Sequence, residues 1–210
     1  MTREREPIAA EDLRVVPANE ASWDDLQAVL GTRGDASTCQ CQRFKLQRKE
    51  SFASLGVEEL SARLREQTHS GQPRASETTG LVAYLDEEPV GWCAVEPRSA
   101  YDGLRRVFRV PWDGRDEDKA DATVWAVTCF TVRVGYRHRG VSRALARAAA
   151  DFARERGARA IEGYAMVVQP GEDVTWGELF VGKRSIFDDA GYTEVHAPSK
   201  RRVVMRIDFS

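Results

Sequence analysis

The feature that most constrains the fold of this 210-residue chain is a long apolar strand, a short basic turn and an amphipathic helix in direct succession. Residues 124–132 (VWAVTCFTV) carry no charge and are rich in β-branched and aromatic types, which predicts a buried strand. The helix is predicted from Arg139 to Gly157, with one apolar face and one arginine-rich face, and Gly157 is the expected stop signal. A buried strand that leads directly into a helix favours an α/β fold.

The rest of the chain predicts more strands and helices around this unit. Strand-like runs lie at 13–17, 81–85, 89–95, 160–167, 192–196 and 203–207, and helices are expected at 23–30, 57–67 and 178–190. No regular element is predicted for 35–54 or 98–120, and 1–10 is expected to be a flexible terminus. The length suits one domain over 1–210, of α/β (α+β) class.

Composition excludes several classes of function. A formal net charge of −2 gives no global basic field, which disfavours nucleic acid as a partner. No apolar run approaches the roughly 18 residues that a membrane span needs, and the polar amino terminus contains no secretory signal. Four cysteines in such a chain suggest free thiols in a reducing compartment, so we expect a cytoplasmic protein.

A metal site is not expected from the cysteines. Cys39 and Cys41 form a Cys-x-Cys pair, whereas structural zinc is usually held by four ligands with Cys-x-x-Cys spacing, and no second pair follows. Cys93 and Cys129 lie in predicted strands and are expected to be small buried apolar groups.

The turn before the long helix has the properties of an anion site. The first turn of a helix offers backbone N–H groups without intrahelical partners, and the helix dipole adds partial positive charge. Gly140 allows close approach of a ligand to the backbone, and Ser142 is too small to block it. Arg139 and Arg143 are positioned to donate charge-assisted hydrogen bonds to phosphate oxygens.

Residues 130–145 (FTVRVGYRHRGVSRAL) resemble motif A of the GNAT superfamily of N-acetyltransferases, Arg/Gln-x-x-Gly-x-Gly/Ala. Arg137 and Gly140 match the motif, Ser142 replaces its last Gly/Ala, and Val134 stands where many members have proline. The Ile186–Tyr192 segment (IFDDAGY) and the predicted hairpin at 81–95 extend the resemblance.

The resemblance implies a mixed, mostly antiparallel sheet of six or seven strands flanked by helices, with motif A at 124–157. It also implies a V-shaped splay between the 124–132 strand and the 160–167 strand. Acetyl-CoA would lie in this splay as co-substrate, with its pyrophosphate on the turn and its pantetheine arm along the first strand. The implied cofactor-binding residues are Phe130, Thr131, Val132, Arg137, His138, Arg139, Gly140, Val141, Ser142, Arg143 and, at the thiol end, Phe187.

The catalytic residues of the family are less visible. Many members carry a glutamate on the strand before the motif, where this chain has Ala126 and Thr128, and a tyrosine where it has Phe187. Direct acetyl transfer needs a neutral amine, oxyanion stabilisation and a proton for the leaving thiolate. The candidates that remain for proton transfer are Glu162, Tyr164 and Ser185.

The sequence thus predicts an acetyl-CoA-dependent N-acetyltransferase that acetylates a primary amine of a small molecule or peptide. A catalytically weak acyl-CoA-binding sensor or interaction domain is the alternative, because the usual glutamate and tyrosine are missing. The state of assembly stays open between monomer and homodimer. Candidates to line the acceptor pocket are Cys41 to Phe44, Tyr101, Trp112 and Trp176.

Overall fold

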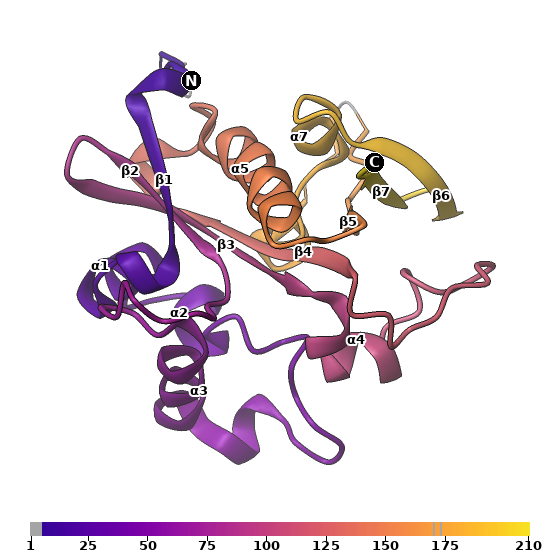
Figure 1. Ribbon diagram of the computed structural model, residues 1–210, viewed down its shortest axis with the longest axis horizontal. Helices are drawn as coiled ribbons and strands as arrows, with labels where there is room; N and C mark the ends of the chain where they lie inside the picture. Colours follow the sequence, from indigo (N-terminus) through magenta and orange to yellow (C-terminus); the bar gives the residue numbers. More distant parts are fainter. Residues whose placement is uncertain (1–5, 170, 173) are drawn as a thin grey trace.

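The computed structural model describes residues 6–169, 171, 172 and 174–210, and within them seven strands form one open sheet (Figure 1). Their order across the sheet is β1-β2-β3-β4-β5-β7-β6, and the one parallel pair in this part of the chain is β4 with β5. The predicted mixed, mostly antiparallel sheet is therefore confirmed. The strands are β1 Leu13–Pro17, β2 Leu81–Leu85, β3 Glu88–Pro97, β4 Val124–Val132, β5 Ala160–Gly163, β6 Thr193–Ser199 and β7 Arg202–Asp208.

The sheet splays between β4 and β5, as expected. Pairing runs from Val124 opposite Ala160 to Val127 opposite Gly163 and then stops, although β4 continues to Val132. The strand predicted over 160–167 is thus wrong in its second half. Beyond Gly163 the backbone leaves β4, and the N–H of Met166 donates to the carbonyl of Gly182 (2.9 Å).

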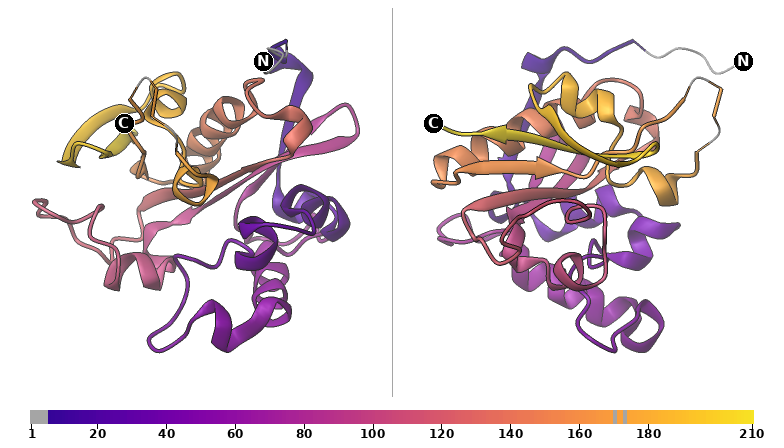
Figure 2. Two further views of the ribbon diagram at one scale, coloured as in Figure 1. Left: turned by 180° about the vertical axis from the view of Figure 1, so that it is seen from behind. Right: turned by 90° about the vertical axis from the view of Figure 1, so that its right-hand side faces the viewer.

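Helices cover both faces of the sheet. Helices α5 (Val141–Glu155) and α7 (Arg184–Asp188) lie on one face, and α1 (Trp23–Leu30), α2 (Asp35–Cys39), α3 (Phe52–Thr68) and α4 (Asp102–Arg106) lie on the other (Figures 1 and 2). Ser22 is the N-cap of α1, since its hydroxyl accepts from the N–H of Asp25 (3.0 Å).

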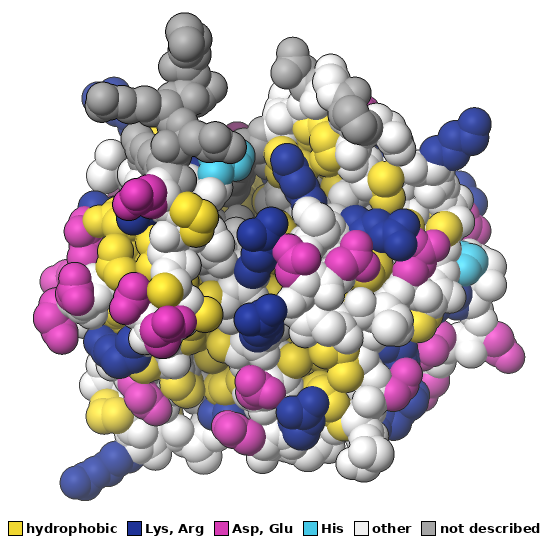
Figure 3. Space-filling view, turned by 90° about the horizontal axis from the view of Figure 1, so that it is seen from above, with side chains coloured by type: hydrophobic (Ala, Val, Ile, Leu, Met, Phe, Trp, Pro, Cys, Tyr) yellow, Lys and Arg dark blue, Asp and Glu magenta, His cyan; other side chains and the backbone are white. Residues whose placement is uncertain are grey.

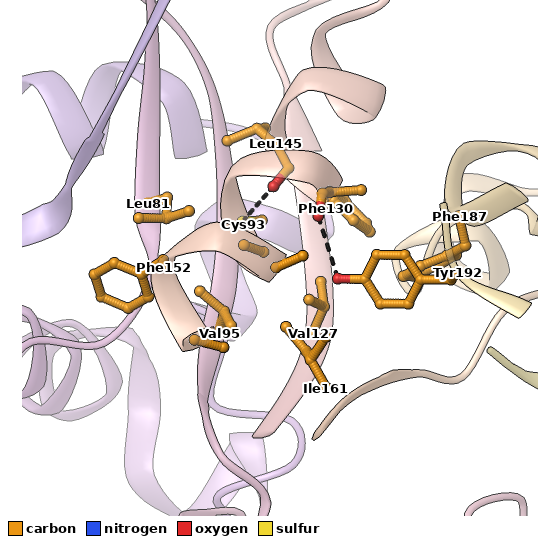
Figure 4. Close-up of a cluster of buried hydrophobic side chains, with 14 of the residues drawn as sticks. Leu81, Cys93, Val95, Val127, Phe130, Leu145, Phe152, Ile161, Phe187 and Tyr192 are labelled. Atoms are coloured by element: carbon orange, nitrogen blue, oxygen red, sulfur yellow. Dashed lines mark hydrogen bonds between the residues drawn. The ribbon is translucent and has the colours of Figure 1, made fainter. Parts of the chain in front are cut away.

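The largest apolar core lies under α5. Leu145 and Phe152 of the helix pack onto side chains of the strands below, among them Cys93, Val127 and Ile161 (Figure 4). These residues repeat at helical spacing on α5 and on alternate positions of the strands, so that each element buries one face. Burial of this core fixes the position of the turn that leads into α5.

Three predictions about helices need correction. Helices α2 and α4 form where none was predicted, because each is held by tertiary packing rather than by a periodic pattern of its own. Helix α3 begins earlier, at Phe52, with a capping box from Ser51 and a break at Gly56. The helix predicted over 178–190 is instead two short helices, α6 (Trp176–Leu179) and α7, since Gly182 adopts a φ of 88° between them.

The amino-terminal segment contacts the motif turn. Residues 1–5 lie outside the described part, but the N–H of Ile8 donates to the carbonyl of Arg139 (2.9 Å) and the Nε of Arg139 donates to the carbonyl of Glu6 (2.8 Å). No helix in the described ranges is long and apolar enough to cross a membrane.

Candidate functional site

The turn before α5 exposes backbone N–H groups toward solvent. Gly140 is the N-cap of α5 with a φ of 96°, and His138 before it also has a positive φ of 62°. The carbonyl of Gly140 accepts from the N–H groups of Arg143 (2.9 Å) and Ala144 (3.1 Å), which closes the first helical turn. The N–H groups of Val141 and Ser142 precede these and have no intrahelical partner. They are therefore available to an anion.

This turn forms one end of a cavity of about 660 Å³. The cavity continues along the edge of β4 to the segment that enters α7, so it follows the splay of the sheet. Figure 3 looks onto this side of the molecule and shows Lys and Arg side chains across its middle. The lining residues are Phe130, Val132, Tyr136, Arg137, His138, Gly140, Val141, Ser142, Arg143, Val168, Glu172, Val174, Leu179, Gly182, Lys183, Ser185 and Ile186.

Most residues implied for the cofactor meet in this cavity, but three do not line it. Thr131 is buried and Arg139 turns toward Glu6. Phe187 is fully buried and packs edge-to-face against Phe130 (5.7 Å between ring centroids). Its contact with the cavity is indirect, through the ring of Phe130.

The arginines of the motif are largely held by the protein itself. The Nε of Arg137 donates to the carbonyl of Val132 (3.0 Å), which ties the turn to the end of β4. Arg143 forms an ion pair with Asp189 at the end of α7 (2.5 Å), and Arg147 donates to the carbonyl of the same residue. Arg133 pairs with Glu88 (2.7 Å). These arginines therefore hold the turn and α7 in place around the cavity.

Sequence reasoning missed the lysine of the cavity. Lys183 is half-buried and lines the same cavity as the turn, and no carboxylate of the described residues lies within salt-bridge distance of it. A cation in this cavity adds to the positive charge that the N–H groups of the turn offer an anion. The signal in the sequence was weak, because Lys183 stands outside the motif and in a segment predicted to be helical throughout.

Glu162, a candidate for proton transfer, lies away from both ends of the cavity in a buried ion cluster. Its carboxylate accepts from Arg98 (3.1 Å), Arg115 and Arg206 (2.7 Å), and the hydroxyl of Tyr164 also donates to it (3.2 Å). Burial opposes its ionisation, but the three guanidinium groups outweigh burial, and the pKa of Glu162 is lowered. A carboxylate with this environment is a weak base.

The other two candidates occupy different places. Ser185 lines the main cavity at the start of α7. Tyr164 lines a second cavity of about 260 Å³ on the opposite face of the sheet. Burial raises the pKa of Tyr164 well above its ordinary value, so its hydroxyl stays protonated.

The second cavity includes part of the pocket expected for the acceptor. Arg43 and Phe44 line it, whereas Tyr101 and Trp112 are buried beside it and the side chain of Trp176 lies outside the described part. Cys41 is buried with its Sγ 3.6 Å from that of Cys129, and both are free thiols. The groups of three or more side chains that a metal needs are absent among the described residues.

A strip of backbone, Leu179–Lys183, divides the two cavities. Leu179, Gly182 and Lys183 line the main cavity, while Phe180 and Val181 line the second. The carbonyl of Phe180 accepts from the N–H of Phe130 (2.7 Å), which places this dividing strip inside the splay, against β4.

Residues 44–171, more than half of the chain, match the model of the Acetyltransferase (GNAT) family. The chain belongs to this family. It is therefore an acyltransferase that uses acetyl-CoA, and the resemblance seen in motif A is confirmed.

The chain is similar to several solved structures at low sequence identity. One acetyltransferase is 17% identical, with a TM-score of 0.54, over 93% of this GNAT chain and 98% of its own. A GCN5-related N-acetyltransferase from Kribbella flavida is 18% identical over 96% and 100% of the two chains (TM-score 0.47). The PaiA N-acetyltransferase from Thermoplasma acidophilum, in complex with coenzyme A, is 12% identical over 94% and 99% (TM-score 0.47). No curated protein matches the chain.

Proposed function

We propose that this GNAT chain transfers the acetyl group of acetyl-CoA directly to a primary amine. The observation that carries the proposal is the main cavity, which joins the N–H groups of the α5 turn to the open edge of β4. The pyrophosphate would accept from Val141 and Ser142, with Lys183 facing it, and the pantetheine arm would lie along Phe130 and Val132.

The free edge of β4 offers one donor for the thioester carbonyl. The N–H groups of alternate β4 residues point toward the splay, and that of Phe130 is taken by Phe180. Because Arg133 donates to Val90 on β3, the N–H of Val132 points the same way as that of Phe130. Val132 therefore supplies the proposed oxyanion donor.

Proton transfer in the proposal does not use Glu162, whose carboxylate is engaged by three arginines. The neutral amine attacks the acetyl carbon, the C–S bond breaks, and the thiolate of CoA takes up the proton that the amine loses. Ser185 in the main cavity and Tyr164 beyond the dividing strip are the side chains that support this transfer, together with solvent.

Two measurements test the proposal. Calorimetry with CoA measures binding, and the release of free thiol from acetyl-CoA in the presence of varied primary amines measures turnover. Gly140→Ala is expected to raise the Kd for CoA at least about tenfold, because a Cβ at a φ of 96° is strained by about 1–2 kcal/mol and the turn relieves this strain by moving the N–H groups away from the pyrophosphate.

Gly157→Ala is the matched control, because it places a similar Cβ at a φ of 76° at the far end of α5, with open space around it. Its Kd for CoA should stay that of the wild type. Absence of CoA binding, or an equal effect of both variants on Kd, would contradict the proposed site. Tight CoA binding without thiol release for any amine would instead favour the acyl-CoA sensor.

A further inference from the structure

The second cavity combines an apolar interior with a charged rim. Its interior is formed by the aromatic rings of Phe44, Phe108, Tyr164 and Phe180, with aliphatic side chains between them. At about 260 Å³ it is smaller than the roughly 300–1,000 Å³ typical of drug-sized ligands, so it suits a group of the size of one amino acid. Three charged side chains also line it: Arg43, Glu178 and Arg202.

The two arginines of this cavity have no carboxylate partner among the described residues. The guanidinium of Arg43 stacks over the ring of Phe180, 4.8 Å from its centroid, and that of Arg202 is half-buried and outside every ion pair of this part of the chain. Burial lowers the pKa of Arg202, because its charge is partly desolvated and the nearby charge of Glu178 offsets this only in part. A half-buried guanidinium is stabilised by an anion that accepts from two of its N–H donors at once.

Glu178 supplies the opposite charge close to the dividing strip. Its carboxylate accepts from Thr175 (3.2 Å) and pairs loosely with Arg201 (3.4 Å), so it keeps the capacity to accept further hydrogen bonds. It directly precedes Leu179, where the dividing strip begins. The rim thus offers two cations, Arg43 and Arg202, to a carboxylate. It offers one anion, Glu178, to an amine on the side of the main cavity.

We propose that the second cavity is the acceptor site, and that the acceptor is a free amino acid with an aromatic or other large apolar side chain. The side chain enters the aromatic interior, the carboxylate binds between Arg43 and Arg202, and the amine lies toward Glu178 and the dividing strip. This inference rests on the proposed function, because the amine nitrogen forms its new bond to the acetyl carbon while the C–S bond of acetyl-CoA breaks.

The position of the strip supports this assignment. The dividing strip is the common wall of the two cavities and lies in the splay of the sheet, where the thioester of a bound cofactor would end. An amine beside Glu178 therefore lies on the acceptor side of the acetyl group. The strip is joined to β4 by the hydrogen bond from Phe130 to Phe180 and to Met166 by the hydrogen bond that Gly182 accepts, so a shift that brings the two substrates together has to break such bonds.

The test compares three amines of the same ring size. Phenylalanine carries the carboxylate, phenylalaninamide resembles the amino terminus of a peptide, and phenethylamine carries neither group. Release of free thiol from acetyl-CoA gives kcat/KM for each. Phenylalanine should exceed both others by roughly 10- to 100-fold, the range expected for one or two charge-assisted hydrogen bonds.

Substitution of the two arginines tests whether they cause the preference for phenylalanine. Arg43→Gln and Arg202→Gln should each lower the ratio of kcat/KM for phenylalanine to that for phenethylamine by roughly tenfold or more. Arg109→Gln is the control, since Arg109 is exposed on the same loop as Phe108 and pairs with Asp113 outside the cavity. Its ratio should equal that of the wild type. Circular dichroism of each variant shows that it is folded.

The outcomes separate this inference from the proposed function. Equal or faster acetylation of phenethylamine or phenylalaninamide, or a ratio unchanged in Arg43→Gln and Arg202→Gln, would overturn the amino-acid acceptor and leave the acetyltransferase intact. Failure to bind CoA, or no thiol release with any amine, would instead overturn the proposed function.

Discussion

The buried ion cluster around Glu162 gives the sharpest prediction about stability. Glu162→Gln keeps the shape of the side chain but removes its charge from three guanidinium groups, those of Arg98, Arg115 and Arg206. Glu162 and Arg98 are both fully buried, so solvent cannot take the place of the lost partner. Breaking a buried ion pair on one side typically costs about 3–5 kcal/mol of unfolding free energy.

The lower end of that range applies here. Glu117 also lies within 3.2 Å of Arg98 and Arg115 and within 3.5 Å of Arg206, and it remains in the variant. We therefore expect a loss of about 3 kcal/mol at pH 7. At about 2–4 °C of melting temperature per kcal/mol for a chain of this length, Tm should fall by about 6–12 °C.

The loss depends on pH with a definite sign. The pKa of Glu162 is lowered in the folded protein, so its ionised form stabilises the fold at pH values above its ordinary pKa of 4.5. That contribution disappears as the pH falls through the lower pKa of the folded state. The difference in unfolding free energy between wild type and Glu162→Gln should therefore shrink steadily below pH 4.5.

Urea denaturation of both proteins at a series of pH values measures this difference. Asp151→Asn is the control, because Asp151 forms an exposed pair with Arg154 (3.1 Å), and such pairs contribute at most about 1 kcal/mol. A loss below about 1 kcal/mol for Glu162→Gln, or a loss that is the same at pH 7 and below pH 4, would refute the electrostatic account. Turnover of the folded variant should fall by less than the roughly 100-fold expected for removal of a general base.

Three further changes test the packing around the site. Gly163→Ala should destabilise the protein by about 1–3 kcal/mol in urea, because its Cβ would lie 2.1 Å from Cε1 of Phe187; an unchanged midpoint would contradict this packing. Phe187→Leu should lower the free energy of unfolding by about 1–3 kcal/mol, since it removes two edge-to-face ring contacts of about 0.5–1.5 kcal/mol each. It should also weaken the binding of acetyl-CoA through Phe130, without altering the pH profile of turnover. Turnover and KM equal to those of the wild type would leave Phe187 without a role near the thiol. The four thiols are buried, and burial raises the pKa of Cys39 to about 12. Ellman's reagent at pH 8 should therefore react slowly with the native protein and fully with the protein in urea. Rapid reaction before unfolding would show that the thiols are accessible.

The proposed cofactor half of the site could be predicted from the sequence because it is local. The turn from Arg137 to Ser142 needs only a buried strand before it and a helix after it, and both follow from periodic patterns within 34 residues. The proposed acceptor half is built from distant segments. Phe44, Phe108 and Arg202 meet through contacts over more than 150 positions, and no local pattern records such contacts.

The dividing strip is a second feature that the sequence could not predict, because distant contacts determine its backbone. The sequence favours one helix over 178–190, but the N–H groups of Phe130 and Met166 donate to the carbonyls of Phe180 and Gly182 and hold this segment in the splay. Tertiary pairing thus overrode local propensity, as it often does for short segments. Lys183 lines the cavity for the same reason, because it belongs to the dividing strip rather than to a helix.

The carboxylate that many relatives carry on β4 has a counterpart here, one strand away. Ala126 on β4 stands directly opposite Glu162 on β5, so the acid lies on the same face of the sheet at the next position across it. There it is held ionised by three arginines, all of which also pair with Glu117 in the loop that precedes β4. Glu162 therefore holds that loop in place and, through the hydroxyl of Tyr164, also holds one wall of the second cavity. A charge used in this way cannot also accept a proton near neutral pH, so the proposed transfer depends on position and on the Val132 N–H more than on a side-chain base.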